Sequence, residues 1–135
     1  MKTYSQFHDG SLEGFWTDVD HVHVYLSTEG KERFTMVAKG VEALSADGFR
    51  KGHIILDVRS RTHEELNLDD LGVLYDLQPG DAGQRQANQL LEKANQQELQ
   101  VLEIYPSYGA TCLILARSFD LLNRNEWLDR YLLAP

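Results

Sequence analysis

Two pairs of residues near the N-terminus have types and spacing suited to metal chemistry. His21 and His23 lie two apart in the alternating run HVHVYLS, so on a strand both side chains project from one face. Two adjacent imidazoles can bind zinc, although a closed site needs a third and a fourth ligand. His8 and Asp9 form a His-Asp step, as in metal-dependent phosphohydrolases, but there the step lies on a helix and here it precedes a predicted strand. One hypothesis is therefore a small metal-dependent hydrolase that uses His8, Asp9, His21 and His23.

The remaining catalytic patterns are missing from the sequence. Cys112 is the single cysteine, and its place between Thr111 and Leu113 in an apolar run predicts a small packed side chain rather than a nucleophile. The chain has no nucleophile-elbow serine, no GxGxxG motif and no Walker phosphate loop. We therefore expect no cofactor, and we favour a non-enzymatic protein.

The charge of the chain indicates a kind of partner. The net charge is -8, and residues 62–104 hold nine Asp and Glu against only Arg85 and Lys93. An acidic surface repels nucleic-acid phosphates and can attract a protein with a basic surface. The preferred hypothesis is a protein-binding domain with two candidate surfaces. These are the acidic residues Glu64, Glu65, Asp69 and Asp70, and the sheet face formed by His21, His23 and Tyr25.

The opening of the chain adds a resemblance. The run FHDGSLEGFW, followed by HVHVYLS and RFTMVAKGVEAL, resembles small uncharacterised bacterial proteins, some of toxin-immunity type. Those proteins open with a Phe-His-Asp step that leads into an antiparallel sheet. The resemblance covers about the first sixty residues and implies a bacterial binding protein that occludes a partner. It supplies no catalytic residues.

The candidate residues must be positioned by strands, and the clearest strand pattern lies over residues 53–60. Ile54, Leu56 and Val58 alternate with more polar positions, of which His53, Asp57 and Arg59 share the other face. Such alternation predicts a strand with one buried and one hydrated face. We expect Ile54, Leu56 and Val58 to line the sheet face that the helices cover.

Further alternating runs complete the predicted sheet. They cover residues 11–18, 21–27, 33–44, 99–105 and 110–117, and Gly40 interrupts the third of these as a bulge would. In the second run, Val22, Val24 and Leu26 should face the core. The short turns between successive runs favour antiparallel pairing.

After residue 60 the apolar period becomes helical. A capping box at Thr62 to Glu65 and a second start at Asn67 precede one short helix, and a longer polar helix should run from about 82 to 97. The tail places Trp127, Leu128, Tyr131 and Leu132 at helical spacing.

These elements predict a single α+β domain over residues 1–135. An antiparallel sheet of about six strands has two central helices on one face and a C-terminal helix. The tail from Trp127 to Leu133 could dock on its own sheet or form a homo-oligomer. No apolar run approaches the roughly 20 residues of a membrane helix, and the N-terminus does not read as a secretory signal. We therefore expect a cytoplasmic location and no membrane partner.

Overall fold

Antiparallel strands form the body of the protein. The computed structural model describes residues 1–47, 53–106 and 112–132. Its strands are β1 (Lys2–Thr3), β2 (Ser11–Thr17), β3 (His21–Ser27), β4 (Arg33–Ala46), β5 (His53–Arg61), β6 (Gln100–Pro106) and β7 (Cys112–Asn123). Its helical elements are η1 (Ser5–Phe7), η2 (His63–Glu65), α1 (Leu68–Tyr75), α2 (Asp81–Gln96), α3 (Arg124–Trp127) and η3 (Leu128–Leu132). The predicted α+β class and antiparallel sheet are confirmed; of the predicted strand 110–117, residues 110 and 111 lie outside the described ranges.

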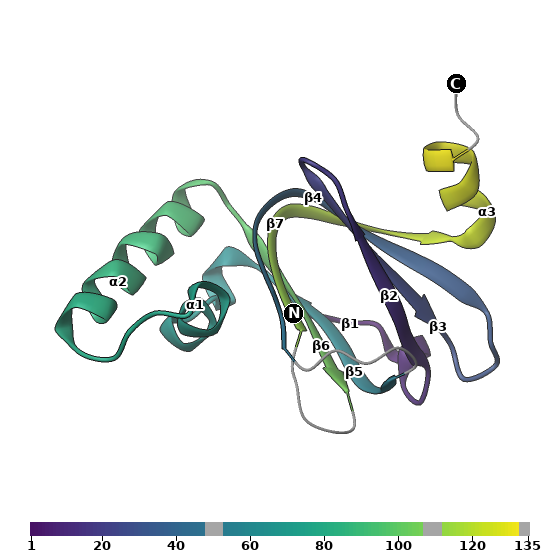
Figure 1. Cartoon of the computed structure of the whole chain (residues 1–135), viewed down its shortest axis with the longest axis horizontal. Helices are drawn as coiled ribbons and strands as arrows, with labels where there is room; N and C mark the ends of the chain where they lie inside the picture. Colours follow the sequence, from purple (N-terminus) through teal and green to yellow (C-terminus); the bar gives the residue numbers. More distant parts are fainter. Residues whose placement is uncertain (48–52, 107–111, 133–135) are drawn as a thin grey trace.

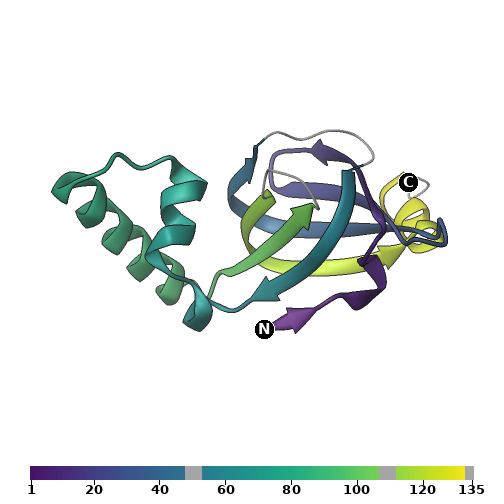
Figure 2. The same cartoon turned by 90° about the horizontal axis from the view of Figure 1, so that it is seen from below.

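The sheet closes into a barrel (Figure 2). The strand order is β1-β5-β2-β3-β4-β7-β6, and β5 also pairs with β6, so six strands complete the ring. The short β1 pairs with β5 at Arg59 and Ser60, whereas β2 pairs with the other end of β5, at Ile54. Closure therefore depends on β5, which holds β2 by one edge and β6 by the other. The sequence predicted about six antiparallel strands but not their closure.

The inner face of the barrel is filled by side chains of its own strands. Val22, Val24 and Leu26 of β3 all point inward and are buried, as the alternation predicted. Phe7 from η1 is also fully buried, and its ring meets that of Phe34 edge to face, with centroids 5.5 Å apart. Complete burial of side chains of this size stabilises the fold by about 1.5–3 kcal/mol each. This inner cluster is the main hydrophobic core.

The prediction for β5 is wrong for two of its three core residues. Ile54 and Leu56 are 51% and 52% exposed, whereas Ile55 and Val58 are fully buried. The register between β5 and β6 shifts between Ile55 and Asp57. Such a bulge adds one residue to one strand and moves the following side chains to the opposite face. Ile55 therefore points inward before the bulge and Val58 points inward after it.

The polar positions of β5 follow the prediction more closely. Asp57 and Arg59 lie on the outside and form an ion pair at 2.5 Å. The side chain of His53, the third predicted polar position, lies outside the described part of the structure.

The bulge predicted in β4 is present. Gly40 has a φ of +63°, and a β-carbon at this position would come within 2.8 Å of the Arg117 side chain. The register of β4 with β7 shifts directly after it, between Val41 and Ala43. A bulge increases local bending, which lets this 14-residue strand curve around the barrel.

Helices α1 and α2 form a lobe outside one end of the barrel (Figure 1). Asn67 caps α1, because its side chain accepts the Asp70 N–H while the Asp70 carboxylate accepts the Asn67 N–H. The predicted capping box of Thr62 and Glu65 is also formed, around η2. The longer helix begins at Asp81, one residue before the predicted start.

The lobe packs on strands that the sequence did not indicate. A second apolar cluster joins the helices to the outer faces of β6 and β7, through Leu66, Leu71, Leu74, Ala94, Leu99, Val101, Leu113 and Leu115. The expectation that these helices cover the face lined by Ile54, Leu56 and Val58 is therefore wrong. The strands' own side chains fill the interior of the closed barrel, so the helices can pack only on its outer surface.

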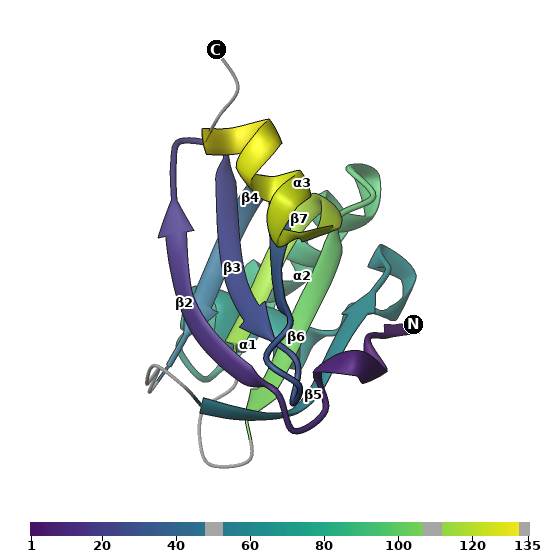
Figure 3. The same cartoon turned by 90° about the vertical axis from the view of Figure 1, so that its right-hand side faces the viewer.

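The C-terminal helical segment, α3 with η3, lies at the other end of the barrel from the lobe. It crosses the outside of β3 and β4 (Figure 3). Asn123 caps α3 by accepting the Glu126 N–H at 2.9 Å, and Glu126 accepts the Asn123 N–H in return. The predicted C-terminal helix is thus confirmed up to Leu132, while Leu133 lies outside the described residues. Across the described ranges, none of the helices is long and apolar enough to cross a membrane.

Candidate functional site

The lobe formed by α1 and α2 carries a strongly acidic surface. Eight acidic residues lie between positions 62 and 98, and two of them, Glu65 and Asp70, are engaged within the fold. The other six are exposed: Glu64, Asp69, Asp76, Asp81, Glu92 and Glu98. The two basic residues of the lobe are Arg85 and Lys93, and Lys93 contacts Glu42 of the barrel at 3.4 Å. The exposed surface of the lobe is therefore mostly uncompensated negative charge.

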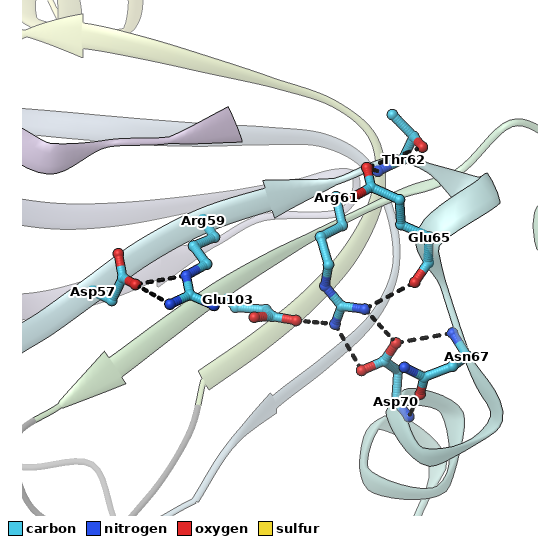
Figure 4. A network of polar contacts seen from close by, with 8 residues as sticks. All are labelled: Asp57, Arg59, Arg61, Thr62, Glu65, Asn67, Asp70 and Glu103. Atoms are coloured by element: carbon cyan, nitrogen blue, oxygen red, sulfur yellow. Dashed lines mark hydrogen bonds and ion pairs between the residues drawn. The ribbon is translucent and has the colours of Figure 1, made fainter. Parts of the chain in front are cut away.

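Asp70, one of the four predicted acidic binding residues, belongs instead to a buried ion network (Figure 4). Its carboxylate accepts two hydrogen bonds from the Arg61 guanidinium, at 2.7 and 2.9 Å. Arg61 also pairs with Glu103 of β6 and donates to the Glu65 carbonyl. The three charged side chains are only 4–13% exposed. This network joins β5, β6 and α1, so Asp70 positions the lobe and is not available to a partner.

Glu65 also has a structural role. Its carboxylate accepts the backbone N–H of Thr62 and contacts the N-terminal ammonium of Met1 at 2.9 Å. These contacts hold the pKa of Glu65 below its usual value, with the bond from the chain terminus as the largest cause. Of the four predicted acidic residues, Glu64 and Asp69 are thus the two that remain exposed without such a structural role.

The second predicted surface, formed by His21, His23 and Tyr25, is not a free sheet face. The C-terminal segment covers it, and His23 is fully buried. The His23 ring lies between Trp16, with ring centroids 4.6 Å apart, and Tyr131, at 4.8 Å. The tail therefore docks on its own sheet, one of the two alternatives that the sequence left open. Self-association through the tail stays a prediction.

The hydrogen bonding of His23 fixes its protonation. The indole N–H of Trp127 donates to His23 Nδ1 at 2.9 Å, and an indole can only donate, so Nδ1 must be unprotonated. The proton of the neutral ring is then on Nε2, which is buried and has no hydrogen-bond partner among the described residues. Burial lowers the pKa of His23; His21 lowers it further, while Asp18 opposes the change. His23 is therefore a buried neutral side chain.

The four residues of the hydrolase hypothesis do not come together. His8 and Asp9 precede β2, and His8 Nδ1 contacts the Leu56 carbonyl at 2.8 Å. His23 pairs with Trp16 near the opposite end of β2. Across the described ranges, no group of three or more His, Cys, Asp or Glu side chains is arranged to hold a metal ion. The geometry gives the hydrolase hypothesis no shared site.

A groove beside the C-terminal segment is a feature that the sequence did not reveal. Arg33 at the start of β4 and Arg124 at the start of α3 line it together with Trp127. The two arginines are 91 positions apart, and they become neighbours because β4 pairs with β7 and Phe34 lies opposite Asn123. No local pattern could have indicated this pairing.

Comparisons of the chain with protein-family models, curated proteins and solved structures found no match. The candidate sites therefore rest on the geometry described above.

Proposed function

We propose that this protein is a non-enzymatic binding domain whose helical lobe holds a protein with a basic surface. The observation that supports the proposal is the set of six exposed acidic side chains on α1, α2 and their flanking turns. This set leaves out Glu65 and Asp70, whose side chains have structural roles. Opposite charge on a partner would speed association and select that partner among many. An immunity-like protein in the bacterial cytoplasm, occluding a basic region of its partner, would work in this way.

Two of the four predicted acidic residues are unsuitable for charge reversal in a test of this proposal. Reversing all four predicted acidic residues would confuse binding with folding, because Glu65 and Asp70 hold the lobe in place. The better variant is Glu64→Lys/Asp69→Lys, which changes exposed side chains only. A matched control, Asp20→Lys/Glu29→Lys, makes the same change of net charge on exposed turns of the barrel.

Proteins of the source cells would be captured on each variant, crosslinked and identified by mass spectrometry. We expect the parent chain and the barrel control to retain the same basic protein. The lobe variant should lose at least about 90% of it, because each lysine repels the basic surface that the acidic side chain attracted. Binding by the parent chain should also fall as salt rises. Equal retention by both variants, or retention that ignores salt, would refute the role of the lobe.

A further inference from the structure

The groove beside the C-terminal segment has the volume of a small-molecule site. Its volume is about 370 Å³, near the lower end of the range for ligand pockets. Its apolar lining comes from Tyr25 of β3 and from Trp127, Leu128 and Leu132 of the C-terminal segment. The groove therefore suits a compact apolar body about the size of one or two rings.

The apolar walls of the groove are already held in position. Tyr25 and Trp127 meet edge to face with ring centroids 5.2 Å apart. The hydrogen bond from Trp127 to buried His23 fixes the indole from behind. A binding site whose walls are ordered before the ligand arrives loses less conformational entropy on binding.

The side chains that line the groove carry a net charge opposite in sign to that of the whole chain. Arg33 and Arg124 both line it and are exposed, and neither forms an ion pair or a side-chain hydrogen bond with any described residue. Glu13 is the single acidic residue in the lining, and its carboxylate accepts the Ser27 hydroxyl at 3.1 Å. The lining charge is thus +1, from two arginines and one glutamate, in a chain of net charge -8.

We propose that this groove binds a small organic acid with one carboxylate and one aromatic or similarly bulky apolar group. The carboxylate pairs with Arg33 and Arg124, whose planar guanidinium groups match its geometry. The apolar group packs against the wall formed by Tyr25, Trp127 and Leu128. A single carboxylate balances the charge of the lining, whereas Glu13 repels a second one. This proposal is independent of the role of the acidic lobe.

The test uses 2-naphthoate as the probe and 2-naphthamide as its uncharged match. Binding is measured by calorimetry and by the NMR signal of the Trp127 indole N–H, assigned with a Trp127→Phe variant. We expect 2-naphthoate to saturate one site and to shift this signal. The amide should bind at least about tenfold more weakly, because it lacks the charge-assisted hydrogen bonds. No saturable binding of 2-naphthoate, or equal affinity for acid and amide, would overturn the proposal.

Variants then locate the carboxylate. Arg33→Gln/Arg124→Gln should weaken 2-naphthoate binding to the level of the amide and leave binding of the amide unchanged. Arg85→Gln, on the distant α2, removes one positive charge elsewhere and should change neither affinity. Equal loss in the Arg85 variant would mean that net charge, and not the groove, governs binding. The comparison of acid and amide on the parent chain needs no variant, so the proposal is tested even if a variant folds poorly.

Discussion

Loss of Arg61 should strongly destabilise this fold. The Arg61→Met variant keeps the length of the side chain and removes the positive charge between Asp70 and Glu103. Those two carboxylates are 11% and 4% exposed, so water cannot replace the lost partner. Removing one partner of a buried ion pair costs about 3–5 kcal/mol, because the other charge stays buried without compensation. A domain of ordinary stability has only about 5–15 kcal/mol in total.

Urea unfolding followed by tryptophan fluorescence would measure this loss. With an m value of about 1–3 kcal/mol per molar urea, the midpoint should fall by roughly 2 M. The unfolding temperature should fall by roughly 10 °C or more. The circular dichroism of the strands would show whether the variant still folds before denaturant is added.

Arg59→Met is the matched control, two residues earlier on the same strand. Arg59 is 41% exposed and pairs with Asp57, so its loss should cost less than about 1 kcal/mol. A triple variant, Arg61→Met with Asp70→Asn and Glu103→Gln, should recover part of the stability because no buried charge is left. If Arg61→Met and Arg59→Met cost the same, the buried network contributes no special stability and the reasoning fails.

Three further predictions concern single side chains. Ile55→Ala should cost about 2–5 kcal/mol of unfolding free energy and Leu56→Ala under about 1, since only Ile55 is buried; equal losses in urea would contradict the bulge. Burial raises the pKa of Cys112 to about 12, so the native protein should not react with a thiol reagent at about pH 8 until urea unfolds it; rapid native reaction would show an exposed thiol. The pKa of His23 in the folded protein lies below the usual 6.5. The stability contributed by neutral His23 is therefore full above pH 6.5 and is lost as the pH falls through the folded pKa. His23→Gln keeps an acceptor for Trp127 without titrating, and should lose less stability than the parent chain between about pH 7 and about pH 5; an equal loss would exclude this role.

The sequence predicted well those features that depend on neighbours along the chain. The alternation of Val22, Val24 and Leu26 correctly gave the inner face of β3, and the capping box of Thr62 was found where expected. Gly40 correctly marked a bulge. Each of these signals depends on residues a few positions apart, so it can be read without knowing the fold.

The main errors in the predicted strands concern which face of a strand becomes covered. The alternation in β5 could not show that one extra residue between Ile55 and Val58 would reverse the inward face, because either register looks regular in sequence. His23 is polar and alternates with core residues, so an exposed position was the natural prediction. Its cover, Trp127, lies 104 residues away along the chain.

By itself, the sequence determined the antiparallel strands, the approximate helices, their caps and the acidic charge of one segment. Only the tertiary structure decided that the sheet closes, that Arg61 and Asp70 are buried together, and that Arg33 and Arg124 flank one groove. The physical reason is that local conformation follows from steric and hydrogen-bonding preferences within a few residues. Burial follows from contacts between segments far apart in the chain, which form only when β5 meets both β2 and β6.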